Sequence, residues 1–366
     1  MSLKRRLTIY IPSLQGSGVD RLYLALIPYF SSHNLDVTLL LDTAPCDLET
    51  NIPKDLKIHV FNERFFSKTF PKLFQYIERE RPDIILTAHK HKSIIVNWVL
   101  SVKQCATKHV ATLHMPPNPA EKVDGSIANL FLPVLMKCFL KFADQIIAVS
   151  NGIADAYHAK YLKNRPIVIE NGIIDRKFLE NYKETSNHPW LTADRKTITF
   201  VAVGRLEQQK DFRTLIRAFA CFRKTSEGKL IIFGEGPQRF ELQSLASELG
   251  FESDIDMPGF KPNILPHIHA ADALISSSIF EAFPLSLTEV LACGTPVIST
   301  NCPYGPSEIL LDGKYGRLTS VGDWRGLCDA MLASLNDKRA IESLHQQRFS
   351  AKTCSEKYLT IFNSIL

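Results

Sequence analysis

The stretch at residues 279–297 reads I-F-E-A-F-P-L-S-L-T-E-V-L-A-C-G-T-P-V. Pro284 suits the first turn of a helix, and Gly294 suits its end. Apolar residues before and after this helix predict a strand on each side. The order strand, loop, helix, strand is typical of a parallel sheet covered by helices. The helix residues expected to face the core are Leu287, Val290 and Leu291.

Two carboxylates lie in this stretch. Glu281 belongs to the loop before the helix, and Glu289 lies within it. If the residues between them were all helical, about 12 Å of axial rise would separate the two. That is wider than the roughly 5–9.5 Å between the paired carboxylates of a glycosidase. The two residues are therefore better placed to hold two parts of one long ligand, and the helix N-terminus offers N–H groups to an anion such as a diphosphate.

The stretch resembles the signature of the family-4 retaining glycosyltransferases of the GT-B fold. The resemblance implies an α/β protein of two Rossmann-like, doubly wound domains, with the donor in the cleft between them. It implies that Glu289 holds the ribose of a nucleotide-diphosphate sugar, expected to be UDP-linked, and that Glu281 holds the hydroxyls of the sugar. The neighbouring residues implied to contact the donor are Ala282, Phe283, Pro284 and Leu285.

The chain has 366 residues, enough for two domains. Residues 1–187 carry 24 Lys+Arg against 18 Asp+Glu, and the remainder carries 19 against 20, so a net +6 and −1 give the total of +5. A mildly basic first half suits an anionic membrane surface or a phosphorylated acceptor. This charge is too dispersed for nucleic acid, and no nucleic-acid motif accompanies it, so no nucleic-acid partner is expected.

The sequence also bears on the compartment. The basic N-terminus is followed by an apolar run that is too short for a signal peptide and fits a first strand, and no run approaches about 18 uncharged apolar residues. The eight cysteines are scattered, without a C-x-x-C pair or a histidine cluster. This pattern indicates reduced thiols and no structural zinc. We expect a cytoplasmic protein that makes peripheral contact with the inner face of the plasma membrane.

Short β-branched runs alternate with helical patterns along the chain, which predicts two parallel sheets with helices on both faces. We expect an acceptor-side domain at residues 1–178, a polar linker at 179–195 and a nucleotide-sugar-binding domain at 196–350. The resemblance implies that a final helix, at 351–366, packs back on the first domain. The expected strands are residues 7–12, 37–41, 84–88, 109–113, 145–149 and 167–170, then 197–203, 229–233, 255–257, 273–276 and 297–299.

Two cations follow the first strand of the second domain. The strand ends at Gly204, which permits close backbone approach, and Arg205 and Lys210 come next. Ligands bind at this edge of open α/β sheets. Cations fixed there for the charge of a diphosphate leaving group can lower the barrier by about 3 kcal/mol. Alone, such residues are usually solvated, but the segment resembles the G-R-L-x-x-x-K of the same enzymes, whose Arg and Lys bind the donor diphosphate.

A glycine-containing loop, Q-G-S-G-V-D-R at residues 15–21, follows the first strand. Gly16 and Gly18 allow a ligand to approach, but Arg21 stands where a dinucleotide fingerprint needs a third glycine, so NAD is poorly supported. The loop resembles the G-G-A-E-R segment of family-4 enzymes, and a plain β–α turn is the alternative. The departures from that segment are Ser17, Val19 and Asp20.

Three further residues are assigned by resemblance. His114 follows the strand at 109–113 and matches the histidine that contacts the donor sugar. Glu235 lies in a G-x-G-P turn near the nucleotide, and Lys261 lies in the loop expected to meet the base. A lone histidine or a Pro/Gly turn also occurs for structural reasons alone. His89 and His91 end another strand and suit either an acceptor phosphate or a solvated basic loop.

Two apolar stretches, residues 65–76 and 127–142, contain lysines among aromatic residues or leucines. Interfacial membrane helices have this composition. A helix packed on its own sheet has it too, and core packing is favoured for most of these residues.

We therefore expect a hexosyl- or N-acetylhexosaminyltransferase that acts on a glycan or lipid-diphosphate-linked acceptor in surface polysaccharide synthesis. The alternatives are a nucleotide-sugar epimerase of the same fold and a noncatalytic nucleotide-sugar-binding protein. The latter would be expected to lack Arg205, Lys210 or Glu281, and all three are present. Two protein cations can replace a divalent ion, and no carboxylate pair suited to Mg²⁺ accompanies them, so neither a metal nor a cofactor is expected.

Overall fold

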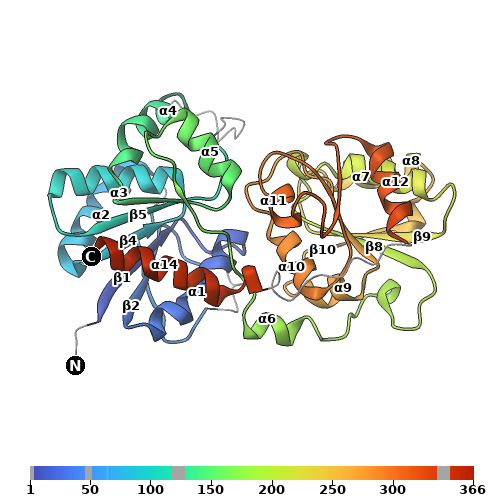
Figure 1. Cartoon of the computed structure of the whole chain (residues 1–366), viewed down its shortest axis with the longest axis horizontal. Helices are drawn as coiled ribbons and strands as arrows, with labels where there is room; N and C mark the ends of the chain where they lie inside the picture. Colours follow the sequence, from blue (N-terminus) through green and yellow to red (C-terminus); the bar gives the residue numbers. More distant parts are fainter. Residues whose placement is uncertain (1–3, 46–51, 64, 118–127, 336–346) are drawn as a thin grey trace. The chain divides into compact units, whose positions relative to one another are not determined.

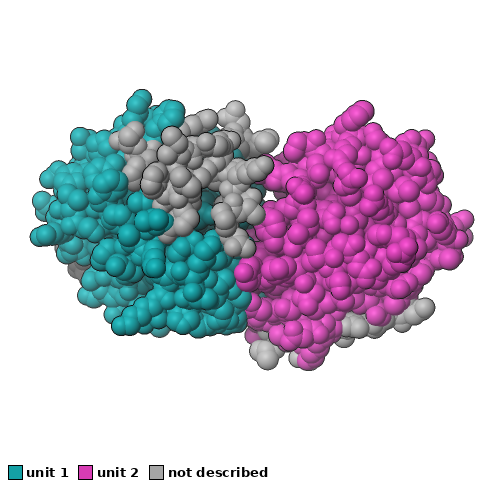
Figure 2. Space-filling view, turned by 90° about the horizontal axis from the view of Figure 1, so that it is seen from above, with its two compact units in different colours: residues 1–173, 349–366 teal, residues 174–348 magenta. Residues whose placement is uncertain are grey.

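The chain forms two compact units in a computed structural model that describes residues 4–45, 52–63, 65–117, 128–335 and 347–366. Unit 1 comprises Met1–Ile173 and Phe349–Leu366, and unit 2 comprises Ile174–Arg348 (Figure 2). Each unit contains one parallel β-sheet with helices on both faces (Figure 1).

The sheet of unit 1 has the strand order β3-β2-β1-β4-β5-β6-β7, and every neighbouring pair is parallel. The order reverses between β1 and β4, as in a doubly wound sheet. The strands are β1 Arg5–Ile11, β2 Leu35–Leu41, β3 Lys57–Val60, β4 Ile84–Thr87, β5 Lys108–Leu113, β6 Gln145–Ala148 and β7 Ile167–Val168.

Right-handed crossovers place α1 on one face of this sheet and α2 to α5 on the other. The last helix, α14, lies alongside α1 (Figure 1), where Phe30 contacts the rings of Tyr358 and Phe362 at 6.1 and 5.6 Å. The helices are α1 Gly18–Ser32, α2 Phe66–Glu80, α3 Lys90–Lys103, α4 Ala128–Phe139 with η1 Leu140–Phe142, α5 Asn151–Lys160 and α14 Ala351–Ile365.

The second face of this sheet has its own core under α2 and α3. Leu73 and Tyr76 of α2 are buried against Tyr10 and Ile85 of the sheet. The expectation that core packing explains most apolar residues of the 65–76 stretch is confirmed for these positions. Phe65 is different, because 69% of it is exposed.

The sheet of unit 2 has the order β10-β9-β8-β11-β12-β13, again parallel throughout. Its strands are β8 Ile198–Val203, β9 Gly228–Phe233, β10 Ile255–Gly259, β11 Ala273–Ser276, β12 Val297–Thr300 and β13 Arg317–Thr319. Its helices are α6 Arg176–Asn181, η2 Pro189–Leu191, η3 Gln208–Lys210, α7 Phe212–Phe222, α8 Arg239–Glu248, η4 Glu252–Asp254, α9 Leu265–Ala270, α10 Leu285–Cys293, α11 Pro306–Leu310 and α12 Trp324–Ser334.

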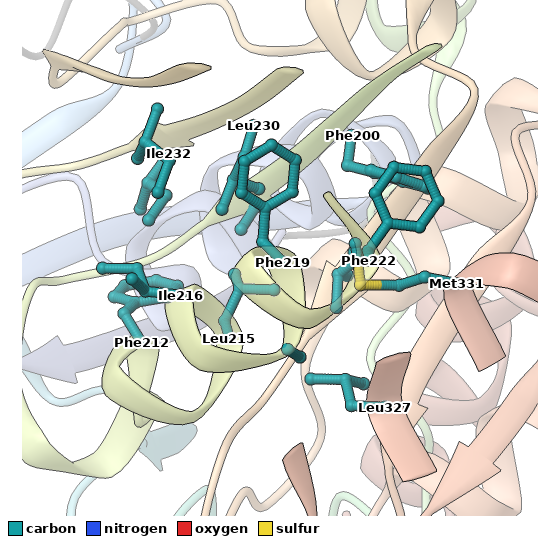
Figure 3. Close-up of a cluster of buried hydrophobic side chains, with 14 of the residues drawn as sticks. Phe200, Phe212, Leu215, Ile216, Phe219, Phe222, Leu230, Ile232, Leu327 and Met331 are labelled. Atoms are coloured by element: carbon teal, nitrogen blue, oxygen red, sulfur yellow. The ribbon is translucent and has the colours of Figure 1, made fainter. Parts of the chain in front are cut away.

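A hydrophobic core of unit 2 lies between β8, β9, α7 and α12 (Figure 3). Phe200, Phe219 and Phe222 are fully buried there, together with Leu327 and Met331 of α12. Burial of each such side chain is worth about 1.5–3 kcal/mol, so this core fixes the strand ends from which the loops of the site begin.

Two strands, β3 and β13, were not expected from the sequence. Both lie at an edge of their sheet, and their residues are exposed or half-buried. An edge strand has only one neighbour and need not be apolar, so the sequence carries little sign of it.

The division between the units also differs from the expectation. It falls after Ile173 rather than after residue 178, and the segment 179–195, expected as a linker, belongs to unit 2. Within it, His188 is buried: Nε2 lies 2.9 Å from Asp256 Oδ2, and the ring packs against Phe233. Long-range side-chain contacts therefore order a segment that has no apolar periodicity.

Candidate active site

The candidate site begins where the strand order of unit 2 reverses. β8 pairs with β9 on one side and with β11 on the other, so the chain leaves the carboxyl ends of β8 and β11 side by side. In doubly wound sheets, ligands bind in the crevice outside such a reversal point. The loops that follow β8 and β11 carry the two cations Arg205 and Lys210 and the carboxylate of Glu281.

The loop after β8 depends on glycine. A Cβ atom at Gly204 would lie 3.0 Å from Lys210 Cε and 3.1 Å from its Cδ, so the lysine stem runs closely over this residue. A Cβ atom at Gly236, in the neighbouring loop, would lie 2.5 Å from the Leu206 carbonyl oxygen. Leu206 N donates to Glu235 O at 2.9 Å. The glycines thus let the loops after β8 and β9 pack against each other and let Lys210 fold over the strand end.

Hydrogen bonds join the loop after β11 to the loop after β8. Ser277 Oγ donates to the Lys210 carbonyl at 2.7 Å, and Ile279 N donates to the Gln209 carbonyl at 2.8 Å. Gln209 Nε2 returns a bond to the Phe280 carbonyl at 3.0 Å. These bonds fix the positions of the two loops relative to each other.

Lys210 and Glu281 meet at this junction. Lys210 Nζ lies 2.5 Å from Glu281 Oε1, and the two side chains are only 21% and 10% exposed. Ser278 Oγ donates to the same carboxylate oxygen at 2.7 Å. A buried carboxylate needs such partners, because its lost hydration has to be replaced. The sequence interpretation missed Ser278, although a serine pair directly after a buried strand could have indicated it.

Arg205 is arranged differently. Its side chain is 78% exposed, and its Nη2 atom lies 2.5 Å from Glu207 Oε1. The structure therefore brings Lys210 and Glu281 together and leaves the Arg205 guanidinium largely in solvent at the same edge of the sheet.

Helix α10 begins directly after this loop. Its N-cap residue, Pro284, makes no side-chain capping bond. Gly294, with φ of 73°, ends the helix as expected. Glu289 is only 2% exposed. Burial of the Cys293 thiol, together with the nearby charge of Glu289, raises the pKa of Cys293 to about 12. The expected core positions Leu287, Val290 and Leu291 are fully buried, while Ala282 and Phe283 are 8% and 6% exposed and Leu285 is half-buried.

Glu235 and Lys261 follow β9 and β10 at the same edge. Glu235 is paired with Arg239 at 2.7 Å and its side chain is 58% exposed. Gly259 has φ of 92°, which favours glycine, and a Cβ atom there would lie 2.6 Å from Glu235 Oε1. Burial, with smaller effects of His188 and Lys261, lowers the pKa of His267 to about 4. The charge of Lys261 therefore acts on His267, a residue of the helix that follows it.

In unit 1, the loop after β1 forms a helix cap. Ser17 accepts a bond from Asp20 N, and Asp20 Oδ2 accepts bonds from the backbone N–H of Ser17 and of Gln15, each at 2.9 Å. Gly16 has φ of 76°, which favours glycine, and Gly18 opens α1. Ser17 and Asp20, two departures from the family segment, therefore form the capping box of α1.

His114 directly follows β5 and is 7% exposed. Its Nε2 atom lies 2.9 Å from Thr112 Oγ1 and 3.2 Å from Tyr23 Oη. Burial, with a smaller effect of His89, lowers the pKa of His114 to about 3, so its imidazole is neutral at pH 7. Burial and the neighbouring Lys92 and Lys90 lower the pKa of His89 to about 4.

Both halves of the chain match known families. The model described as "Glycosyltransferase Family 4" matches residues 16–176, and the model described as "Glycosyl transferases group 1" matches residues 184–353. The chain is a family-4 glycosyltransferase. Its two doubly wound units are those of the GT-B fold, so the expected fold class and enzyme class are confirmed.

Relatives of this glycosyltransferase differ in their names. The N-acetyl-alpha-D-glucosaminyl L-malate synthase of Bacillus anthracis is 25% identical over 100% of this chain and 98% of its own. The N-acetylgalactosamine-N,N'-diacetylbacillosaminyl-diphospho-undecaprenol 4-alpha-N-acetylgalactosaminyltransferase of Campylobacter jejuni is 26% identical over 92% of this chain and 91% of its own. HepE of Anabaena, solved with UDP, superposes with a TM-score of 0.79 at 21% identity, covering 98% of this chain and 100% of HepE.

Among the residues that the structure describes, there is neither a membrane-spanning helix nor a cluster of metal ligands. None of the helices there is both long and apolar enough to cross a membrane. No group of three or more His, Cys, Asp or Glu side chains in those same ranges is arranged to hold a metal ion.

Proposed function

We propose that this glycosyltransferase moves a hexosyl or N-acetylhexosaminyl group, with retention at the anomeric carbon, from a UDP-linked sugar to a glycan or lipid-linked acceptor in surface polysaccharide synthesis. The observation that carries the proposal is the Lys210–Glu281 pair at the strand reversal of unit 2, directly before the N-terminus of α10. A cation, a carboxylate and free helix N–H groups at one sheet edge suit a ligand that has both phosphates and hydroxyls.

Each residue then has a role. Lys210 and Arg205 stabilise the negative charge that grows on the diphosphate as the glycosidic bond breaks, and the N-terminal N–H groups of α10 add to this field. Glu281 accepts hydrogen bonds from the hydroxyls of the donor sugar, and Glu289 accepts them from the ribose. Before the donor arrives, Lys210 pairs with the buried carboxylate of Glu281.

The relatives support the choice of substrates. HepE was solved with UDP and with UDP-glucose, and the two curated relatives are named for transfer of N-acetylated amino sugars. Their acceptors differ, because one name specifies malate and the other a diphospho-undecaprenol-linked sugar. The nucleotide and the sugar class are therefore better supported for this chain than the acceptor.

A product assay tests the function. The protein is incubated with a panel of nucleotide sugars and either a diphospho-undecaprenol-linked sugar or malate, and the products are identified by mass spectrometry. A glycosylated acceptor with an α-linkage from an α-linked donor is the expected result. Donor conversion without an acceptor product would indicate an epimerase. Saturable UDP binding without any turnover would indicate a noncatalytic binding protein.

An exposed aromatic and basic surface of unit 1 supports a lipid-linked acceptor. We call it the aromatic–lysine surface, and we define it by Phe65, Lys68, Trp98, Lys141 and Phe142. Its three aromatic residues are 69%, 40% and 57% exposed in chain order. Each lysine lies over the adjacent aromatic ring, Lys68 at 6.0 Å from that of Phe65 and Lys141 at 5.2 Å from that of Phe142. Aromatic side chains beside lysines suit the interface of an anionic bilayer.

The charge of the supporting helices agrees with this surface. Helix α3 contacts both α2 and α4, and the sequences of α3, α4 and η1 contain lysines but no acidic residue. Basic residues near an anionic membrane contribute about 1 kcal/mol each. We therefore propose that unit 1 binds reversibly to anionic membranes at this surface, where a lipid-linked acceptor would be present.

A further inference from the structure

The hydrogen bonds around His114 determine which of its ring nitrogens carries the proton. Thr112 Oγ1 lies 2.8 Å from the backbone carbonyl of Thr87 and donates to it. A carbonyl can only accept, so the single hydroxyl proton of Thr112 is used in this bond. Toward every other neighbour, the Thr112 oxygen can only accept.

His114 Nε2 lies 2.9 Å from this oxygen. Since the oxygen has no proton left to donate, Nε2 must carry one. Tyr23 Oη lies 2.7 Å from Thr112 Oγ1 and donates to the second lone pair of that oxygen. The distance from Tyr23 Oη to His114 Nε2 is longer, 3.2 Å. This assignment satisfies all four groups, whereas an unprotonated Nε2 would face the Thr112 oxygen lone pair to lone pair.

A neutral imidazole carries one ring proton, so Nδ1 of His114 is then a bare acceptor. The Nδ1 atom is buried and has no hydrogen-bond partner among the described residues. A buried acceptor without a donor is less stable than a paired one, because its lost hydration is not replaced. The site therefore favours a ligand that brings a hydrogen-bond donor to Nδ1, and it disfavours a group that can only accept, such as a carboxylate or phosphate oxygen.

We propose that Thr112 is a positioning residue that holds His114 in the Nε2–H tautomer, so that Nδ1 accepts a hydrogen bond from a hydroxyl of the sugar substrate. The assignment of the hydroxyl to a sugar rests on the proposed glycosyl transfer. The tautomer itself follows from the contacts of Thr112 and does not depend on that function.

The first experiment reads the tautomer directly. The full-length protein, labelled with ¹⁵N in its histidine rings, is studied by long-range ¹H–¹⁵N correlation at pH 7, with His114→Gln to assign the signals. We expect His114 to be protonated at Nε2 and unprotonated at Nδ1 in the wild type and in Thr112→Ser. Thr112→Val, which removes the acceptor at constant size, is expected to give a mixture of tautomers. A wild-type His114 protonated at Nδ1, or an unchanged tautomer in Thr112→Val, would overturn the proposal.

The second experiment compares kinetics. Thr112→Val is expected to lower kcat/KM for the sugar donor about tenfold, and Thr112→Ser is expected to retain the wild-type value. With a donor that lacks the contacting hydroxyl, wild type and Thr112→Val should have the same kcat/KM. Thr8→Val is the matched control, because Thr8 is equally buried in the same sheet and bonds Tyr76 Oη at 2.9 Å. An equal loss in Thr8→Val, or the same loss with every deoxy donor, would mean that Thr112 is only structural. If no donor is turned over while the tautomer is as expected, glycosyl transfer fails and the tautomer assignment stands.

Discussion

At the scale of single residues, Lys210 and Arg205 differ in their surroundings. Lys210 is held over Gly204 and against Glu281, whereas Arg205 is mostly exposed. A preorganised lysine needs no rearrangement when charge develops on the diphosphate, while the arginine has to settle on the ligand. The two cations should therefore be separable by kinetics.

Replacing either cation by alanine should lower kcat about a hundredfold or more, the scale of losing one group that stabilises the charge of the transition state. Lys210→Ala should also raise KM for the donor, because Glu281 loses its counter-charge. Lys224→Ala, an exposed lysine of the same unit, is the control. Steady-state kinetics with thermal unfolding provide the measurement, and near-wild-type turnover in both variants with an intact fold would rule the assignment out.

Gly204→Ala is a further prediction at this scale. The added methyl group would lie 3.0–3.1 Å from the Lys210 stem, which is flexible and can move away. We expect stability close to that of the wild type but a loss of kcat of about tenfold or more, because small misplacements of a catalytic group are costly. Turnover equal to wild type would show that the position of Lys210 over the glycine is unimportant.

At the scale of elements, the proposed diphosphate site draws its positive potential from the loop after β8 and from the N-terminus of α10. Two lysine or arginine charges and the helix N-terminus can take the place of a divalent ion. Activity should therefore survive treatment with EDTA and subsequent desalting. Complete loss that Mg²⁺ or Mn²⁺ restores would mean that the donor site has been assigned wrongly.

The aromatic–lysine surface also belongs to this scale, because it depends on α2, α3 and α4 lying in a row. Lys68→Glu with Lys141→Glu should weaken sedimentation with phosphatidylglycerol vesicles severalfold and leave UDP affinity unchanged. Lys72 is a poorer choice for this test, because its Nζ atom is held by Glu63 at 3.2 Å and by the Phe61 carbonyl at 2.7 Å.

The control for this experiment carries the same change of net charge elsewhere in unit 1. Lys54→Glu with Lys163→Glu alters two exposed lysines that lie outside α2, α3 and α4. A similar loss of binding in this control would indicate a general charge effect. Wild-type protein that stays entirely in the supernatant at low salt would favour a soluble acceptor.

At the scale of the whole molecule, buried histidines make stability depend on pH. His109 is fully buried between Asn97 and Thr87, and burial lowers its pKa from 6.5 to about 3. Between these values the unfolded chain binds a proton that the native protein does not bind. The free energy of unfolding should therefore fall as the pH falls from about 6.5 toward 3, by up to about 1.4 kcal/mol per pH unit for each such histidine.

Chemical denaturation of the wild type at several pH values between 7 and 4 measures this slope. His109→Gln, which keeps polar atoms at the site, should make the slope shallower. An unchanged slope in the variant would mean that His109 does not titrate in this way. His114 has a pKa lowered to a similar value, so its contribution should remain in the variant.

Much of the architecture was predictable because it depends on residues that are close together in the sequence. The limits of α10 follow from Pro284 and Gly294, and its buried face follows from the spacing of its leucines and valine. Alternation of β-branched runs with helical patterns was enough for two doubly wound domains. The edge strands β3 and β13 were not predicted because they are short and their residues are exposed or half-buried. The segment around His188 was not predicted because tertiary contacts alone order it.

The sequence by itself determined the two carboxylates and two cations of the candidate site. Arg205, Lys210 and Glu281 follow strands and Glu289 lies within a helix, and local patterns reveal all of these elements. Only the tertiary structure decided which of them meet. Lys210 and Glu281 are 71 positions apart, and Tyr23 and His114 are 91 apart, yet each pair is in contact. The physical reason is the doubly wound topology: strands that neighbour each other in the sheet, such as β8 and β11, are distant in the chain. The contacts across their ends therefore leave no periodic trace in the sequence.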